Sequence, residues 1–320
     1  MTQGSRNVLV TGGAGFIGSH VADAYIARGD RVWVLDNLSR GNRDNVPAAA
    51  EFIEADIADP SVRDLFRDVR FDIVNNHAAQ IDVRVSVTDP AVDARANIFG
   101  LLNLTEAALE VGTSRFIYVS SGGVVYGEPS VMPTPEVTPK DPRSPYGVSK
   151  LAGEFYLNYY RRVRGLSYVA LRYSNVFGPR QDPHGEAGVV AIFCQRLLDE
   201  EPLTIYGDGE QTRDYVYVKD VVSANMRATD MTIDDEQGMD QVAFNVATGI
   251  GTSVNRLADN IEEIAGVHPG REYRSARVGE LRHSQLDSSQ LKSHGWAPKS
   301  DLRDGLRETF EHIAGARVGT

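Results

Sequence analysis

Short runs of β-branched and aliphatic residues alternate with segments of helical periodicity through the first half of the chain. This alternation predicts six strands, at residues 7–11, 31–36, 51–55, 73–76, 115–120 and 168–173. Between them it predicts four helices, at residues 15–27, 60–69, 93–111 and 146–164. Strands and helices that follow one another in this way are typical of a parallel sheet covered by helices on both faces. The fold class predicted is therefore α/β, with a doubly wound parallel sheet.

The alternation loosens after residue 178, where a second, smaller α/β region is expected. The elements expected beyond residue 178 are strands at residues 203–206, 215–218 and 242–246 and a closing helix with the apolar stripe Leu302, Leu306, Phe310 and Ile313. We expect residues 1–178, together with about 218–250, to form the sheet domain. Residues 179–217 and 251–320 are expected to form the smaller C-terminal region.

Two segments depart from plain alternation. Six prolines between residues 129 and 145 exclude regular structure there and predict a long ordered loop. The helix expected at residues 93–111 has apolar residues on more than one side. It is therefore expected to be covered on two faces, one of them by a partner subunit.

Charge and cysteine content narrow the class of protein. The net charge is −11 and no run of Lys or Arg is present, which argues against nucleic-acid binding. No apolar stretch approaches the length of a membrane span, and the first seven residues leave no room for a signal peptide before the first strand. Cys194 is the only cysteine, so a reducing, cytoplasmic location is expected. The seven histidines lack ligand spacing, so no metal site is predicted.

A glycine-rich segment, Gly12-Gly13-Ala14-Gly15-Phe16-Ile17-Gly18, joins the first predicted strand to the first predicted helix. Strand, turn and helix in this order are the context that a dinucleotide fingerprint requires. Gly12 permits the tight turn, Gly15 lets the backbone approach a pyrophosphate, and Gly18 lets helix and strand pack closely. The helix N-terminus supplies amide N–H groups and a partial positive charge to the phosphates. The segment predicts a Rossmann-type dinucleotide site.

Asp36 ends the second predicted strand, 18 residues after Gly18. Its carboxylate is expected to accept hydrogen bonds from the adenosine ribose and to repel a 2′-phosphate, which favours NAD over NADP. Arg40 and Arg43 lie nearby in the sequence and weaken that exclusion. Asp56 follows the third strand, and two roles stay open for it: a hydrogen bond to adenine, or a cap of its own loop.

Tyr146 and Lys150 lie one turn apart on one face of a predicted helix. A tyrosine with the ordinary pKa of about 10 is a poor base at neutral pH. A nearby ammonium and a positive nicotinamide ring both favour the phenolate and lower that pKa. Following a dinucleotide fingerprint, the pair predicts acid/base chemistry beside the cofactor, with Lys150 also placed to bond the nicotinamide ribose.

With these motifs in place, the chain resembles an extended short-chain dehydrogenase/reductase of the UDP-glucose 4-epimerase family. The matching segments cover nearly its whole length: residues 12–18, 36–37, 56–57, 77–80, 97, 120–127, 146–150, 175, 207–209, 213–216 and 277–287. The resemblance implies that Tyr146 removes the proton of the sugar C4 hydroxyl while C4 gives a hydride to NAD. The 4-keto sugar then turns and takes the hydride back on its other face, so NAD stays bound.

The resemblance also implies the residues of the two binding sites. The cofactor contacts implied are Gly12, Gly15, Phe16, Ile17, Gly18, Asp36, Asn37, Asp56, Ile57, Ala78, Ala79, Gln80, Asn97, Tyr146 and Lys150. The substrate contacts implied are Ser121, Tyr126, Tyr146, Asn175, Val189, Tyr206, Arg213, Arg277 and Ser284. Among these, Arg213 and Arg277 are expected to neutralise the diphosphate of a UDP-sugar held by the C-terminal region. Tyr126 either contacts the sugar or packs.

One position departs from the family pattern. These enzymes carry a Ser or Thr three residues before the valine of Val-Tyr-Gly, where it assists the catalytic tyrosine, and here that place is held by Gly122. Ser121 is expected to take the role, which would make it catalytic together with Tyr146 and Lys150. A water, or Tyr146 working alone, is the other possibility, and both Ser120 and Ser121 could instead cap the strand.

The same segment separates related activities. The resembling 4,6-dehydratases carry an Asp-Glu pair before Val-Tyr-Gly, and the UDP-glucuronate decarboxylases carry a glutamate there. Gly123 and Val124 offer no proton-transfer group, which disfavours elimination and decarboxylation. A UDP-glucuronate 4-epimerase and a net keto-reductase stay open as alternatives, as does a catalytically silent NAD-binding regulator.

The remaining expectations concern the range of substrates accepted, the role of His77 and the oligomeric state. In the family, the position of Ser284 is tyrosine where N-acetylated sugars are rejected and small where they are accepted. Serine therefore predicts that UDP-N-acetylhexosamines are accepted as well as UDP-hexoses. His77 is expected to shape the turn after a strand and not to act as a base. The helices at residues 93–111 and 146–164 are expected to form a homodimer interface, as the resemblance implies.

Overall fold

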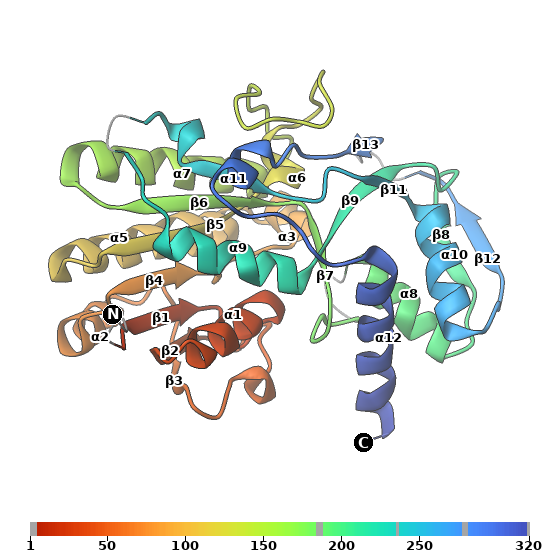
Figure 1. Cartoon of the computed structure of the whole chain (residues 1–320), viewed down its shortest axis with the longest axis horizontal. Coiled ribbons are helices and arrows are strands. Elements are labelled where there is room, and N and C mark those ends of the chain that lie inside the picture. The colour runs from red at the N-terminus through yellow and green to blue at the C-terminus, as the bar shows by residue number, and fades with distance from the viewer. Residues whose placement is uncertain (1–4, 184–187, 235–236, 277–280, 319–320) are drawn as a thin grey trace.

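The computed structural model describes residues 5–183, 188–234, 237–276 and 281–318. In this part of the chain seven parallel strands form one sheet in the order β10-β6-β5-β4-β1-β2-β3 (Figure 1). They are β1 (Asn7–Thr11), β2 (Arg31–Asp36), β3 (Glu51–Glu54), β4 (Ile73–Asn76), β5 (Arg115–Ser121), β6 (Tyr168–Tyr173) and β10 (Ala243–Val246). The predicted doubly wound sheet is confirmed, and the six expected strands of the first half differ from those observed by one residue at most.

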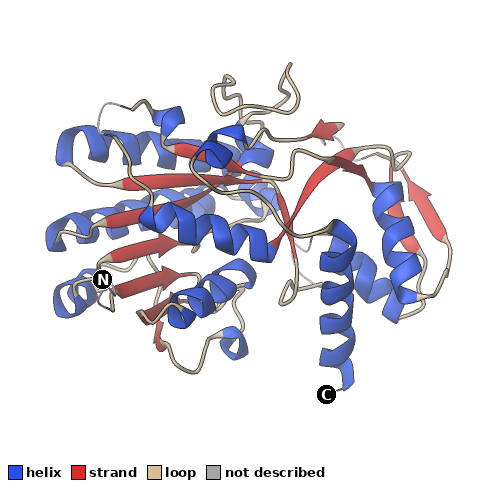
Figure 2. Ribbon diagram, in the orientation of Figure 1, coloured by secondary structure: helices blue, strands red, loops and turns tan. Residues whose placement is uncertain are grey.

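Helices cover both faces of the sheet, as Figure 2 shows. On one face lie α1 (Phe16–Ala27) and α9 (Val218–Asp230), and on the other lie α2 (Val62–Val69), α5 (Gly100–Val111) and α7 (Pro145–Arg164). Successive side chains of a strand point to opposite faces, so Val8 and Val10 pack with α1 while Leu9 packs under α2 and α5. None of the helices in the described residues is long and apolar enough to cross a bilayer.

The helix expected at residues 93–111 is wrong as a single α-helix. It consists of α4 (Pro90–Ala94), a π-helical turn η2 (Arg95–Phe99) and α5. The N-terminus lies earlier than expected because Asp89 caps α4, accepting hydrogen bonds from the N–H groups of Ala91 and Val92. A π-turn adds one residue to the helical ladder and changes which side chains face inward, and such turns recur at functional sites.

The second region packs around its own core. It contains β7 (Asn175–Phe177), β8 (Leu203–Tyr206), β9 (Thr212–Tyr217), β11 (Gly251–Ser253), β12 (Arg271–Arg274), β13 (His283–Ser284), α8 (Val189–Leu198), α10 (Val254–Ala265) and α12 (Leu302–Val318). Phe193, Leu257 and Leu306 are among the buried residues that join its three helices. Cys194 is buried in the same cluster. Since β10 belongs to the large sheet and α9 covers one of its faces, the chain crosses between the regions more than once. The exact domain limits stay a prediction.

The proline-rich segment forms no helix or strand between residues 129 and 144, as predicted, its last proline, Pro145, begins α7, and the segment is tied to the second region by backbone pairing. Thr134 N donates to Gln285 O and Asp287 N donates to Thr134 O, each over 2.9 Å. Short helices complete the described structure: η1 (Arg43–Asn45), α3 (Val83–Thr88), α6 (Gly122–Val125), η3 (Met239–Gln241) and α11 (Ser289–Ser293).

Candidate active site

Two glycines are required in the turn between β1 and α1. Gly12 has a φ of +66°, and a Cβ built on it would lie 2.6 Å from the backbone nitrogen of Ala78. A Cβ built on Gly18 would overlap the carbonyl oxygen of Gly12. Gly15 caps α1 without a side chain, so it supplies no acceptor of its own to the N–H groups of the first turn. Close backbone approach and a helix N-terminus together make a cradle that fits the pyrophosphate of NAD.

Asp36 lies at the end of β2 and faces this turn. Its Oδ2 accepts a hydrogen bond from Ala14 N over 3.0 Å, and its Oδ1 accepts one from Leu38 N over 2.9 Å. Burial raises the pKa of Asp36, and the two N–H groups oppose that rise. Arg40 is drawn away toward Asp82, at 3.4 Å. These contacts orient the Asp36 carboxylate at the cradle, where a ribose hydroxyl of NAD is expected.

Asp56 and Asn37 meet beside Asp36. Asp56 Oδ1 accepts the N–H of Ala58 over 2.8 Å, so the loop-capping role is present. Its Oδ2 accepts a hydrogen bond from Asn37 Nδ2 over 3.3 Å. Both side chains face solvent-accessible space next to the cradle, and their contact with the adenosine part of NAD stays a prediction.

Asn97 is buried in the π-turn, and its amide is occupied by the protein. Asn97 Oδ1 accepts from Gln80 N over 3.0 Å, while Nδ2 donates to Gln80 O, to Asp93 Oδ1 and to Ser149 Oγ. Gln80 Nε2 also donates to Asp93 Oδ1 over 3.0 Å. Asn97 therefore holds the segment that follows β4, including the expected cofactor contacts Ala78, Ala79 and Gln80.

Tyr146 and Lys150 lie in the first two turns of α7. Ser144 begins the helix, accepting a hydrogen bond from Gly147 N over 3.1 Å, and Pro145 occupies the first helical position. The Nζ of Lys150 lies 5.8 Å from the ring centroid of Tyr146 and donates to Val119 O over 3.0 Å. The helix thus places both predicted catalytic side chains at the carboxyl end of β5, as the sequence indicates.

Lys150 is a buried cation. Burial lowers its pKa to about 8, and the carboxylates of Asp93 and Glu154 oppose that decrease. His77 lies at the end of β4, and burial together with the Lys150 charge lowers its pKa to about 3. A histidine with that pKa is neutral and a very weak base at neutral pH, which agrees with the expected structural role of its turn.

The two serines at the end of β5 have different surroundings. Ser120 is buried and donates to Glu154 Oε1 over 2.5 Å. Ser121 is half-buried, and its hydroxyl makes no hydrogen bond within the described residues. A Cβ built on Gly122 would overlap Cδ1 of Leu286. A serine at residue 122, the position given by the family pattern, would require the Leu286 side chain to shift, while the Ser121 hydroxyl is not engaged by the described residues.

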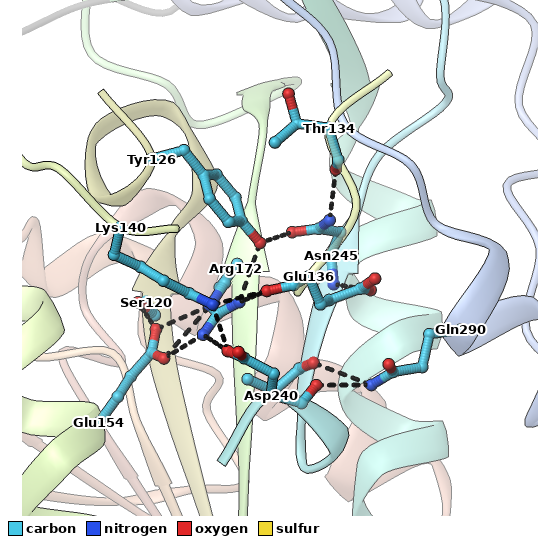
Figure 3. Close-up of polar contacts among 11 residues, drawn as sticks. Ser120, Tyr126, Thr134, Glu136, Lys140, Glu154, Arg172, Asp240, Asn245 and Gln290 are labelled. Atoms are coloured by element: carbon cyan, nitrogen blue, oxygen red, sulfur yellow. Dashed lines mark hydrogen bonds and ion pairs between the residues drawn. The ribbon is translucent and has the colours of Figure 1, made fainter. Parts of the chain in front are cut away.

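A buried ion pair lies beside Ser120 (Figure 3). Arg172, on β6, and Glu154, on α7, are both fully buried, and the guanidinium approaches the carboxylate to 2.6 Å. Arg172 also donates to Asp240 Oδ1, to Tyr126 Oη and to the carbonyl oxygen of Glu136, over 2.9, 2.9 and 3.1 Å. One side chain thereby joins β6, α6, α7 and the proline-rich loop.

Of the two roles expected for Tyr126, packing is the one that the structure shows. The residue is 3% exposed, and its hydroxyl accepts from Arg172 and donates to Asn245 Oδ1 over 2.8 Å. Asn245 in turn donates to the carbonyl oxygens of Thr134 and Asp287. The hydroxyl is therefore engaged in the buried network, and a hydrogen bond from it to the sugar would require breaking that network.

On the substrate side, β13 lies directly beside β9. Ser284 is the register partner of Arg213. A small cavity of about 10 Å³ is lined by Ser284 and Leu286 on one side and by Gly122 and Tyr126 on the other. The structure therefore brings Ser284 to the catalytic end of the sheet.

The other expected substrate contacts lie on separate elements of the second region. Asn175 is the exposed first residue of β7, Val189 begins α8 and Tyr206 ends β8. Arg277 lies outside the described residues. Contacts of all four with a nucleotide sugar stay predictions.

Sequence reasoning missed the polar groups behind the site. Arg172 breaks an otherwise apolar strand, Tyr-Val-Ala-Leu-Arg-Tyr, and such a charge in a buried strand signals a buried partner. Glu154 follows Lys150 by one helical turn, which places it on the same face. Leu286 carries no signal, because its contact with Gly122 joins positions more than 160 residues apart.

Comparisons with known proteins agree over nearly the whole chain. The sequence model of the NAD dependent epimerase/dehydratase family matches residues 8–247. A UDP-glucose 4-epimerase of Mycolicibacterium smegmatis is 43% identical over 309 residues, covering 95% of this chain and 97% of that protein. The structure of UDP-glucose 4-epimerase with UDP-glucose from Thermotoga maritima superposes with a TM-score of 0.93 at 46% identity, over 97% and 99% of the two chains. That of UDP-N-acetylglucosamine 4-epimerase from Methanobrevibacter ruminantium M1, in complex with UDP-N-acetylmuramic acid, gives 0.92 at 36% identity, over 98% and 100%.

Glu154→Ala is expected to lower the free energy of unfolding by about 3–5 kcal/mol, because it removes the fully buried carboxylate of Arg172 and leaves the guanidinium with only the partly exposed Asp240. The double variant Glu154→Leu with Arg172→Met removes both charges and should cost less than the single change. Urea denaturation followed by circular dichroism measures both. Glu272→Ala, at an exposed surface pair, is the matched control and should change little. A Glu154→Ala variant as stable as this control would contradict the assignment.

Proposed function

The chain belongs to the NAD dependent epimerase/dehydratase family, and on this premise we propose how its residues invert C4 of a UDP-hexose. The activity is that of an NAD-dependent isomerase of the UDP-glucose 4-epimerase type, so the resemblance stated from the sequence is confirmed. The observation that carries the residue roles is the meeting of the glycine cradle and the Tyr146–Lys150 pair at one edge of the sheet.

The residues at the cradle fit NAD. Gly12 and Gly18 leave no space for a Cβ, so the backbone and the N-terminus of α1 can approach a pyrophosphate closely. Asp36 offers oxygen acceptors to the adenosine ribose and disfavours a 2′-phosphate. The chemistry that NAD would supply there is reversible hydride transfer at C4 of the sugar.

Tyr146 is the proton-transfer group in this proposal. Its phenolate takes the proton of the C4 hydroxyl as the ketone forms and returns a proton to the same oxygen as the ketone is reduced. The ammonium of Lys150, 5.8 Å from the Tyr146 ring centroid, favours that phenolate by charge. Because the proton and the hydride both return, the reaction consumes no external reductant.

Ser121 assists Tyr146. Its hydroxyl is the one at the end of β5 without a hydrogen-bond partner in the described residues, whereas the Ser120 hydroxyl is bonded to Glu154. A hydroxyl at residue 122 would need the space that Leu286 fills. The unengaged hydroxyl supports Ser121 as the residue that holds the C4 oxygen beside Tyr146, and no observation favours the water-mediated or unassisted alternatives.

The second region binds the nucleotide sugar. Arg213 and Arg277 neutralise the diphosphate and Asn175 contacts it or the sugar, in keeping with the family pattern. Ser284 lies beside Arg213, and its small side chain takes less space than a tyrosine would at the position where a 2-acetamido group is expected. The similarity to a UDP-N-acetylglucosamine 4-epimerase supports a site that accepts both UDP-hexoses and UDP-N-acetylhexosamines.

The chain assembles as a homodimer through α5, η2 and α7. Phe155, Tyr159 and Val163 on α7 are 51–63% exposed, and Phe99 at the end of η2 is 65% exposed. Exposed apolar side chains gathered on neighbouring helices favour burial by a partner, and a second copy offers the same two helices.

A cytoplasmic location, expected from the single cysteine, stays a prediction.

Purified protein without added cofactor is expected to interconvert UDP-glucose with UDP-galactose, and UDP-N-acetylglucosamine with UDP-N-acetylgalactosamine. Proton NMR of the anomeric signals measures both conversions. Ser284→Tyr is the matched control and should keep the first conversion while losing the second. A net reductase would instead consume added NADH in proportion to product. Conversion of UDP-glucuronate alone would favour the uronate alternative, and no turnover of any sugar would favour the regulator.

Ser121→Ala is expected to lower kcat about a hundredfold by removing a hydrogen bond to the reacting oxygen. Ser120→Ala should instead lower the melting temperature more than kcat, because its hydroxyl serves Glu154. Tyr146→Phe sets the reference for lost proton transfer, at least about a thousandfold. Steady-state kinetics and thermal melting separate the two serines. If Ser121→Ala kept full kcat, Tyr146 would work alone or with water.

Sedimentation equilibrium is expected to give twice the mass of the chain. Phe155→Glu should shift that mass toward the monomer, since it places a charge in the proposed apolar interface. Val137→Glu changes a residue of similar exposure in the proline-rich loop and is expected to leave the mass unchanged. A monomer at micromolar concentration in the unsubstituted protein would overturn the assembly.

A further inference from the structure

Lys150 must carry its charge in a place without solvent. The residue is 4% exposed, and burial alone lowers its pKa. The negative groups that oppose this are Asp93, on α4, and Glu154, one turn further along α7. Glu154 is bound to Arg172, and Asp93 accepts hydrogen bonds from Asn97 and Gln80. Both carboxylates therefore divide their charge among other partners.

The immediate surroundings of the ammonium contain no carboxylate bond within the described residues. Lys150 Nζ donates to the carbonyl oxygen of Val119 and lies over two aromatic rings, those of Tyr118 and Tyr146. Tyr118 is the nearer, with 5.3 Å between Nζ and the ring centroid. His77 also faces Lys150, but burial and the lysine charge keep it neutral, so it adds no attraction.

Tyr118 is held against Lys150 from two directions. It lies on β5 and is 1% exposed, and its hydroxyl donates to the carbonyl oxygen of Lys150 itself over 3.2 Å. Gly153, on α7, leaves the room for this ring, because a Cβ there would overlap the Tyr118 hydroxyl oxygen. Burial raises the pKa of Tyr118 well above its ordinary value, so the phenol stays neutral. The ring is a rigid, uncharged surface under the ammonium.

We propose that Tyr118 is a positioning residue whose aromatic face holds the Lys150 ammonium charged and directed at Tyr146. This inference rests on the roles proposed for Tyr146 and Lys150. A desolvated ring attracts a cation through its quadrupole and takes no proton from it. A carboxylate in the same place would bind the ammonium as a salt bridge and draw it away from the phenol. The ring supports the charge and leaves the N–H donors of Lys150 to be shared with Val119, Tyr146 and the ribose.

The direction in which the pKa of Lys150 changes without the Tyr118 ring follows from the positive charge of the ammonium. Removing the ring weakens the attraction to the ammonium, so the pKa of Lys150 falls from about 8 to a lower value. Lys150 is charged below its pKa and neutral above it. Turnover that needs the charged form is then lost at a lower pH, and the alkaline limb of kcat against pH moves down. The charges of Asp93, Glu154 and Arg172 are unchanged by the substitution.

The test compares Tyr118→Leu with Tyr118→Phe in the NAD-bound protein. The chain has five lysines, so ¹³C labelling of the lysine ε-carbon gives few NMR signals, and Lys150→Arg identifies the one from Lys150. In Tyr118→Leu the pKa of Lys150 and the alkaline limb of kcat are both expected to fall by about one pH unit. In Tyr118→Phe, which keeps the ring and loses the hydroxyl, both should stay within about 0.3 unit.

Tyr168→Leu is the matched control for lost volume. Tyr168 is a fully buried tyrosine of the same core cluster, and no ring contact or hydrogen bond joins it to Lys150 in the described structure. This variant is expected to lose stability while keeping the titration of Lys150. If Tyr118→Leu does not fold, phenylalanines with increasing fluorination at residue 118 weaken the π-face at nearly constant size, and the pKa should fall in steps.

An unchanged pKa of Lys150 in Tyr118→Leu, or in the fluorinated series, would overturn the inference. A pKa that falls without movement of the alkaline limb would overturn the positioning role in turnover. If the unsubstituted protein turned over no UDP-sugar, the proposed function would fail, and the NMR titration would still decide whether the ring supports the charge. Loss of turnover in Tyr146→Phe with no pKa change in Tyr118→Leu would reject this inference alone.

Discussion

The buried ion pair of Arg172 and Glu154 determines how the segments of the active site lie relative to one another. A guanidinium without access to water is stable only where its N–H groups are satisfied, and here they bond Glu154, Asp240, Tyr126 and the backbone of Glu136. The partners come from α7, η3, α6 and the proline-rich loop. Because moving any of these segments would leave part of the charge unpaired, they hold one arrangement.

That arrangement explains why the neighbouring residues Ser120 and Ser121 have different surroundings. Ser120 points from β5 to the ion pair, and its hydroxyl donates a hydrogen bond to Glu154. Ser120 is therefore part of the buried interior. Ser121 is the next residue along the chain and faces away from it. A loop held by Thr134 brings the Leu286 side chain over Gly122, where the family carries a hydroxyl. Glycine at residue 122 fits the packing of Leu286 against it, and the hydroxyl proposed to assist Tyr146 lies one residue earlier, on Ser121.

The sequence predicted the parts of this structure that depend on local chemistry. Alternating apolar runs gave the six strands, and the glycine spacing around Gly12 and Gly18 reflects contacts within one turn. The π-turn at Arg95–Phe99 could not be read in the same way, because it depends on bonds from Asn97 to Gln80, 17 residues earlier, and to Ser149, 52 residues later. The engagement of the Tyr126 hydroxyl likewise depends on Asn245, 119 residues away. Periodicity reports which face is buried, and it does not report the partner.

The charges around Lys150 also depend on contacts between residues that are distant in the sequence. A base as weak as a tyrosine needs a cation nearby, yet a cation that is buried loses its proton more easily. Free carboxylates would hold the proton on Lys150 and would also neutralise its effect on Tyr146. The chain instead binds Glu154 to Arg172 and Asp93 to two amides, and places an aromatic ring under the ammonium. Because burial lowers the pKa of Lys150 only to about 8, its ammonium stays charged at neutral pH, 5.8 Å from the ring centroid of Tyr146.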